Sequence, residues 1–184
     1  MFIKTLIKKY TINLALSFVL AVVIIALRLE TNIINVILVL AGSLLGTFLL
    51  DLDYLVFAFI VEPNHHFSQR LRELVVQKNL DGALLYIDHN KSAIPRLTLH
   101  SALFQSVLAV ITLYVLTSSN DIFGQAFVIS GFLQSIYKVV DEYQQTKNVD
   151  RWFWILKEKP TKNMLYGYFS ILIVVFLYSL SFIG

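Results

Sequence analysis

The chain contains no cysteine among its 184 residues. Disulfide bonds, thiolate metal ligands and thiol nucleophiles are therefore excluded, and a bound metal would need oxygen and imidazole ligands. The sequence also lacks a phosphate-binding glycine loop, a Gly-x-Ser-x-Gly nucleophile elbow and a His-Glu-x-x-His zinc motif. Several common classes of nucleotide-binding and hydrolytic enzyme are thus unsupported.

Charged residues are scarce as well. They make up 15% of the chain, whereas 57% of the residues are apolar and the mean hydropathy is +0.71. A soluble domain of this size does not need so many apolar residues to fill its core, so we expect a lipid bilayer as partner and solvent. The net charge of +3 does not predict a nucleic-acid partner, because basic residues in membrane proteins mainly set orientation.

Long uncharged runs, by contrast, are abundant. About 20 helical residues cross a hydrocarbon core ~30 Å thick. Five such runs predict transmembrane helices at residues 10–29, 32–51, 101–119, 122–140 and 164–183, and the long stem of Lys138 lets its charge reach the membrane surface. The first run is too long for a secretory signal and lacks a small-x-small cleavage site. The sequence predicts an all-α integral membrane protein, with one membrane domain over residues 1–184 and loops at 54–99 and 141–163.

The basic residues predict the orientation of these spans. Of the 15 Lys and Arg residues, all except Arg28 precede the first span or lie in or beside the two long loops. The positive-inside rule assigns those segments to the cytoplasm, so we expect a multi-pass cell (inner) membrane protein. Its N-terminus would be inside and its C-terminus outside. The short connections at 30–32 and 118–121 would make the helices that they join antiparallel neighbours.

The loop over residues 54–99 has a pattern of its own. It opens with an apolar stretch at 55–61 and continues with Phe67, Leu71, Leu74 and Val75 at helical spacing. This spacing predicts an amphipathic cytoplasmic segment lying on the inner membrane surface. Asp81-Gly82 is expected to break this helix before a second short apolar element at 83–87.

Acidic residues collect at the cytoplasmic ends of the spans. Counting ~1.5 Å per residue places Asp51 and Asp53 at the inner edge of the hydrocarbon, with Asp141 and Glu142 at the same depth. His100 begins the third span at this level. Carboxylates there are costly unless they are solvated, paired or bound to a metal. The cluster offers ligands that suit Zn²⁺, Mn²⁺ or Mg²⁺, and such an ion could activate water beside a lipid phosphoryl or acyl group.

Other features favour structural roles for these acids. Residues two apart on a helix point about 200° away from each other, so Asp51 and Asp53 can converge only where the helix ends or distorts. Lys138 lies close enough along its helix to pair with Asp141 or Glu142.

The remaining histidines and small residues also allow two interpretations. His65 and His66 could supply further metal ligands or could simply be solvated, and His89 beside Asp88 is equally ambiguous. Small-x-x-x-small pairs, which favour close helix packing, are formed by Gly42, Ser43, Gly46 and Thr47. The run Arg151-Trp152-Phe153-Trp154 is typical of an interfacial aromatic belt.

One family shares this order of motifs. Gly42-Ser43-Leu44-Leu45-Gly46 leads to Asp51-Leu52-Asp53, and after the long loop Arg96-Leu97-Thr98-Leu99-His100-Ser101 opens a hydrophobic helix. The arrangement resembles the YdjM-like (LexA-regulated) inner-membrane metal-dependent hydrolases. The resemblance implies a metal-dependent hydrolase with Asp51, Asp53 and His100 as metal ligands.

The chain departs from the pattern of that family at three histidine positions. Tyr54 stands where the first motif has histidine, Pro95 stands at the leading histidine of the second, and Tyr137 lies four residues before Asp141. Either a loop histidine compensates for these losses, or the chain is a divergent member that keeps the scaffold without hydrolysis.

Two functional hypotheses follow. The first is a hydrolase-like protein acting on a lipid or a lipid-linked phosphate or ester at the cytoplasmic boundary. Its divalent metal would be held by Asp51, Asp53, His100, His65 and His66. Asp141 or Glu142 would complete the metal site or act as general base. The rival is a non-catalytic membrane subunit or scaffold whose cytoplasmic loops dock a membrane or cytoplasmic protein partner. A transporter is disfavoured because three of the spans hold almost no ionisable residue.

Overall fold

The computed structural model describes residues 2–90, 94, 97–156 and 159–183, with side chains described from Tyr10 onward. Helices account for about 75% of the chain, and the described part contains no strand. The elements are α1 Phe2–Arg28, α2 Ile33–Gly46, α3 Leu52–Val56, the π-helix η1 Phe57–Val61, α4 His66–Val76, α5 Leu80–Asn90, α6 Ala102–Ser118, α7 Ile122–Thr146 and α8 Lys162–Leu180. The prediction of an all-α chain is confirmed.

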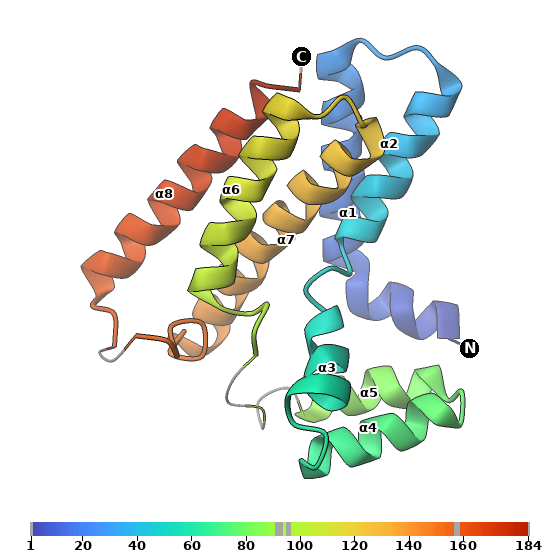
Figure 1. Ribbon diagram of the computed structural model, residues 1–184, viewed down its shortest axis with the longest axis vertical. Helices are drawn as coiled ribbons and strands as arrows, with labels where there is room; N and C mark the ends of the chain where they lie inside the picture. The colour runs from blue at the N-terminus through green and yellow to red at the C-terminus, as the bar shows by residue number, and fades with distance from the viewer. Residues whose placement is uncertain (1, 91–93, 95–96, 157–158, 184) are drawn as a thin grey trace.

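The long helices α1, α2, α6, α7 and α8 form a bundle that runs alternately up and down (Figure 1). The helix α7 lies at its centre and packs against α1, α2, α6 and α8. Side-chain caps fix where the helices begin: Asp121 accepts the backbone N–H of Phe123 and Gly124, and Ser101 accepts that of Phe104. The left-handed residue Lys147 ends α7.

Two glycines bring α2 and α7 into close contact. A Cβ atom on Gly42 would lie 2.6 Å from the carbonyl oxygen of Phe123, and one on Gly46 would lie 2.6 Å from that of Phe127. No side chain fits in that space, so the two backbones touch. The predicted role of the small residues in helix packing is confirmed.

Hydrogen bonds between buried side chains join α1, α2 and α7. The Ser17 hydroxyl lies 2.7 Å from that of Thr47 and 3.1 Å from that of Ser130. The Gln134 amide donates to Ser17 at 2.9 Å and accepts from Asn13 at 2.8 Å. Hydrogen bonds of this kind hold helices together where lipid surrounds them, because hydrophobic attraction between helices is then weak.

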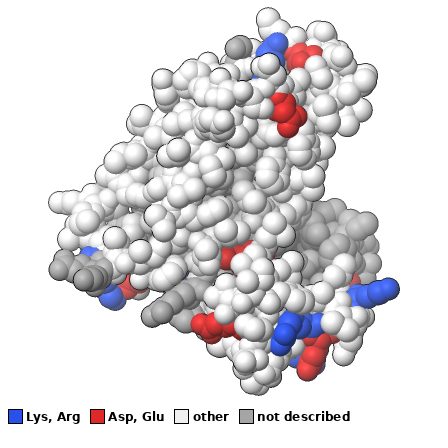
Figure 2. Space-filling model, in the orientation of Figure 1, with Lys and Arg blue, Asp and Glu red and all other residues white. Residues whose placement is uncertain are grey.

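In the described part of the chain, two helices are long and apolar enough to cross a membrane, Tyr10–Arg28 within α1 and Lys162–Leu180, which is α8. Most of their apolar surface faces outward, since 28% and 17% of the residues in these two spans are buried. Figure 2 shows the charged atoms of one face near the two ends of the molecule, with a broad uncharged band between them.

The boundaries of two predicted spans differ from the helices. The span predicted at 32–51 ends as a regular helix at Gly46, after 14 residues, and tight turns follow before α3. In the opposite sense, α7 continues through residues 141–146, part of the predicted loop at 141–163. The apolar run therefore extends beyond the end of α2, whereas α7 extends beyond the apolar run that predicts it.

Within the connection over residues 54–99, the described helices α3, η1, α4 and α5 fold into a compact cluster of their own. Its core contains Tyr54, Phe57, Ala58, Phe67, Leu71, Leu74, Ala83, Ile94 and Leu97. The helix α4 is amphipathic as predicted, but its apolar face packs against this core. The prediction that this face lies on the membrane is wrong, because the cluster supplies enough apolar surface to cover it.

The break after α4 also falls elsewhere than predicted. Lys78 has φ of 56° and turns the chain, whereas Asp81 and Gly82 lie in the first turn of α5. The Asn79 side chain accepts the backbone N–H of Gly82 at 2.9 Å and so begins the new helix. The second apolar element predicted at 83–87 is confirmed as part of α5.

Candidate functional site

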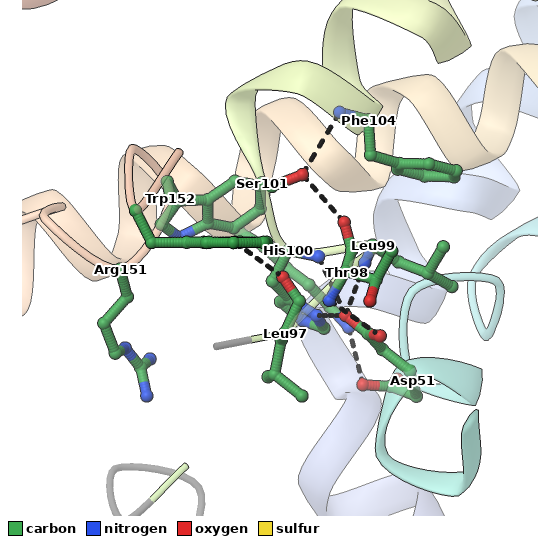
Figure 3. A network of polar contacts seen from close by, with 12 residues as sticks. Asp51, Leu97, Thr98, Leu99, His100, Ser101, Phe104, Arg151 and Trp152 are labelled. Carbon is green, nitrogen blue, oxygen red and sulfur yellow. Dashed lines mark hydrogen bonds and ion pairs between the residues drawn. The ribbon is translucent and has the colours of Figure 1, made fainter. Parts of the chain in front are cut away.

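Asp53 holds the segment that leads into α6. Its side chain is 1% exposed. The backbone N–H of Thr98 donates to one carboxylate oxygen at 3.1 Å, and those of Leu99 and His100 donate to the other at 2.6 and 2.9 Å. The corresponding dashed lines converge in Figure 3. Such charge-assisted bonds are strong, so Asp53 fixes the start of the third long helix.

His100 is placed by this same carboxylate. Its Nδ1 atom lies 3.1 Å from Asp53 Oδ2, and its ring packs between those of Tyr54 and Trp152. Burial lowers the pKa of the His100 imidazole below its usual range, although the hydrogen bond with Asp53 acts in the opposite direction. A neutral imidazole then donates its Nδ1 proton to Asp53 and keeps Nε2 as an acceptor.

Asp51 turns away from Asp53 toward α7. Its Oδ1 atom accepts a hydrogen bond from the Lys138 ammonium at 2.6 Å, while Oδ2 is buried without a hydrogen-bond partner in the described part of the chain. The Asp-x-Asp pair therefore does not converge, as its spacing predicts for helical geometry. Lys138 pairs with Asp51, not with the acids on its own helix.

Glu142 forms the second ion pair of this region. Its two carboxylate oxygens accept hydrogen bonds from Arg151 at 3.0 and 2.9 Å, and one of them also accepts from Trp152 Nε1 at 3.0 Å. Trp152 is 1% exposed, so the predicted interfacial belt is wrong at this residue. The sequence did not predict that Arg151 and Trp152 bind Glu142, because these contacts cross the turn after α7 and follow no helical spacing.

The histidines of the long connection lie elsewhere. His65 accepts the backbone N–H of Phe67 at 3.2 Å and so caps α4, and its ring packs on Phe57. His66 is exposed. The ring of His89 lies 2.8 Å from the carbonyl oxygen of Leu85. The structure does not bring His65 or His66 to the residues that line the cavity around His100.

A cavity of about 660 Å³ opens at this end of the bundle. Its walls come from α1, from the chain at 51–54, from the end of α5, from His100, from α7 and from the segment 148–152. The residues lining it include Tyr10, Asn13, Asp51, Tyr54, Asp88, His100, Tyr137, Lys138, Asp141, Glu142, Gln145, Asp150, Arg151 and Trp152. The structure thus gathers Asp51, His100, Asp141 and Glu142 around one space, while Asp53 lies behind its wall.

The residues present do not fit the predicted divalent metal site. Both oxygens of Asp53 are occupied by four hydrogen-bond donors, and the Lys138 ammonium beside Asp51 would repel a cation. Among the described residues, no group of three or more His, Asp and Glu side chains is arranged to hold a metal ion. Tyr54 and Tyr137, at two of the positions where the family pattern has histidine, line the cavity with phenol groups.

None of the family models, curated proteins or solved structures compared with the chain matches it. The similarity to the YdjM-like hydrolases therefore stays a prediction from the motif residues. Of that motif, Pro95 and Arg96 lie outside the described residues.

Proposed function

We propose that the chain is a five-span membrane protein whose cavity binds the headgroup of an amine-bearing phospholipid without hydrolysing it. Its N-terminus would lie in the cytoplasm and its C-terminus outside. Support for the spans comes from the alternating bundle, from the two helices long enough to cross a bilayer, and from the uncharged band between the charged ends. The cation count of the sequence supports the orientation.

The charge of the cavity wall is the observation that carries the proposed ligand. Five carboxylates line the cavity, from Asp51, Asp88, Asp141, Glu142 and Asp150, against two cations, Lys138 and Arg151. Each of these cations is paired with one of the acids, and Asp150 pairs with Lys159, which lies outside the lining, whereas Asp141 accepts from a neutral amide. A ligand that brings its own positive charge therefore suits the wall better than a wholly anionic one.

The aromatic lining fits an ammonium group. Tyr10, Tyr54, Tyr137 and Trp152 all line the cavity. Aromatic faces next to carboxylates attract ammonium ions through the ring quadrupole and through charge. Asp141 is the natural partner for that ammonium, because it lines the cavity and accepts a hydrogen bond from the neutral amide of Gln145 at 2.8 Å rather than from a cation.

The two cations suit the other half of such a headgroup. Lys138 and Arg151 place hydrogen-bond donors at the wall, and both side chains bind phosphate oxygens well. The cavity volume of about 660 Å³ falls within the ~300–1,000 Å³ typical of small-ligand pockets. A zwitterionic headgroup thus finds a partner for each of its charges.

The engaged state of the acids argues for binding without hydrolysis. A general base needs a free lone pair near the reacting proton, but Glu142 accepts three hydrogen bonds from Arg151 and Trp152, and Asp141 would be bound to the ammonium of the ligand. Two alternatives stand beside lipid binding. The first is the metal-dependent hydrolase predicted from the family resemblance, and the second is a scaffold that docks a protein partner. Metal content separates the first alternative from lipid binding, and a stoichiometric co-purifying protein identifies the second.

Lipid retention tests the proposal. The chain is placed in nanodiscs that contain equal amounts of phosphatidylethanolamine and phosphatidylglycerol, and bound lipid is measured by native mass spectrometry. Phosphatidylethanolamine should be retained preferentially and displaced by soluble glycerophosphoethanolamine. Asp141→Asn should reduce retention about ten- to a hundredfold, the effect of one charge-assisted hydrogen bond. Glu73→Gln, a change in an exposed ion pair on α4, should retain lipid as wild type does. Equal retention of both lipids would refute the proposed ligand.

A further inference from the structure

Every exposed side chain from Leu44 in α2 to Val61 in η1 is apolar, while residues 46–51 are buried or half-buried. The apolar row consists of Leu44, Leu45, Leu52, Leu55, Phe59 and Ile60. Ile60 is 73% exposed, an unusual state for an isoleucine. The row crosses the turns after Gly46 without a charged side chain on its outer side, since Asp51 and Asp53 both point inward.

The other side of this segment is firmly packed. Tyr54, Phe57 and Ala58 are buried in the core of the small cluster, and Phe57 packs against the rings of His65 and Phe67. The segment α3–η1 is therefore held in place by protein on one side and offers only apolar surface on the other. Contiguous apolar surface of this kind marks a contact with a membrane or with another protein.

We infer that the outer surface of α3–η1 inserts into the cytoplasmic leaflet of the membrane. The inference rests on the proposed membrane embedding of the bundle. It is carried by the position of the segment directly after α2, because Leu44 and Leu45 would face lipid and no polar side chain is exposed between them and Ile60. The fixed orientation of the segment favours lipid further, since its ordering requires no partner.

The insertion assigns a function to the short helices. Asp51 and Tyr54, which line the cavity, lie within the same stretch of chain as the inserted side chains. Holding Leu55 and Phe59 at the edge of the acyl chains therefore keeps the cavity at the depth of the phospholipid headgroups. The cluster formed with α4 and α5 would lie on the water side, where its charged outer residues are solvated.

Single-cysteine labelling tests this placement, because the chain has no native cysteine to compete. Three full-length variants are compared in phospholipid nanodiscs, each with an environment-sensitive fluorophore. Ile60→Cys reports on η1, Val174→Cys reports on α8, where the side chain is 64% exposed, and Arg70→Cys reports on the exposed side of α4. Quenching by nitroxide lipids is measured against quenching by aqueous iodide.

The expected result is strong quenching of the labels at 60 and 174 by nitroxide lipids, and quenching of the label at 70 by iodide alone. A label at 60 that iodide reaches as readily as the label at 70 would overturn the insertion while leaving the membrane bundle intact. A label at 60 shielded from both quenchers would also overturn it, in favour of a protein partner or a second copy of the chain. A label at 174 that nitroxide lipids do not quench would instead overturn the embedding of the bundle itself.

Discussion

The helix bundle and the α3–α5 cluster both have apolar cores, but the bundle also buries a network of hydrogen-bonded polar side chains. In the bundle, buried side chains include Ser17, Thr47 and Gln134, while apolar residues of α1 and α8 face outward. In the cluster, Phe67 and Leu71 are buried and Arg70 is exposed. Burying apolar surface lowers the free energy only where water is the alternative.

Under the proposed membrane embedding, the two regions meet different solvents. The buried apolar face of α4 suits water around the cluster, whereas the glycine contacts and internal hydrogen bonds of the bundle suit the proposed lipid surroundings. The candidate site lies at the boundary of the two regions, where Asp53 from the cluster side holds the start of α6.

Loss of apolar volume should separate the regions most clearly. Leu71→Ala in the cluster core should cost about 2–5 kcal/mol, because it opens a cavity at a fully buried position. Ile171→Ala on the outer face of α8, where the side chain is 63% exposed, should leave stability close to wild type. Urea unfolding in detergent, with proteolysis of the cluster as a local readout, measures both. Equal losses in the two variants would contradict the assignment of two solvents.

Asp53→Asn should have the next largest effect, about 2–3 kcal/mol. The amide keeps one acceptor oxygen but turns donor hydrogens toward backbone N–H groups that need an acceptor. Hydrogen exchange of residues 98–101 should rise in this variant. Asp81→Asn, which lies in the first turn of α5, serves as the control and should keep the exchange of this segment unchanged.

Gly46→Ala should cost about 1–3 kcal/mol through overpacking, since the new methyl group would lie 2.6 Å from the carbonyl oxygen of Phe127. Gly167→Ala on α8 is the matched control, because nothing lies within 4 Å of its added methyl group. Alanine there should stabilise the helix slightly. The two melting temperatures are compared, and a drop for Gly167→Ala as large as that for Gly46→Ala would contradict the close α2–α7 contact.

The smallest expected effect is on the pH dependence of stability. Because the pKa of His100 is lowered in the folded chain, the unfolded chain binds the proton more readily. This contribution to stability is present above the unfolded pKa of about 6.5 and is lost as pH falls below it. As the pH is lowered from 8 to 5, the melting temperature should therefore fall less steeply for His100→Gln than for wild type. The exposed His66→Gln should keep the wild-type slope.

The helical class and the approximate positions of the five long helices could be predicted because uncharged runs of about 20 residues favour long helices. The end of α2 at Gly46 could not be predicted, since the hydropathy of the sequence stays high through Leu50 while the backbone turns. The buried face of α4 was identified correctly from its spacing, but spacing does not reveal whether lipid or protein covers a face.

The sequence predicted that several of the acids and His100 lie close together, but it did not predict which groups they bind. Depth along the helices was enough to bring Asp51, His100 and Asp141 to one cavity. The partners of Asp53 are backbone N–H groups, which every residue but proline carries, so no residue type signals them. The pairing of Glu142 with Arg151 depends on how the chain turns at Lys147.

The metal content of the purified chain tests most directly whether the clustered acids and His100 have structural and binding roles. Zn, Mn and Mg are measured by elemental analysis after purification in detergent, for wild type and His100→Ala. The account predicts far less than one metal ion per chain in both proteins, because the carboxylates are committed to Lys138, Arg151 and the backbone at 98–100. One ion per wild-type chain, lost in His100→Ala, would contradict it and support the metal-dependent hydrolase.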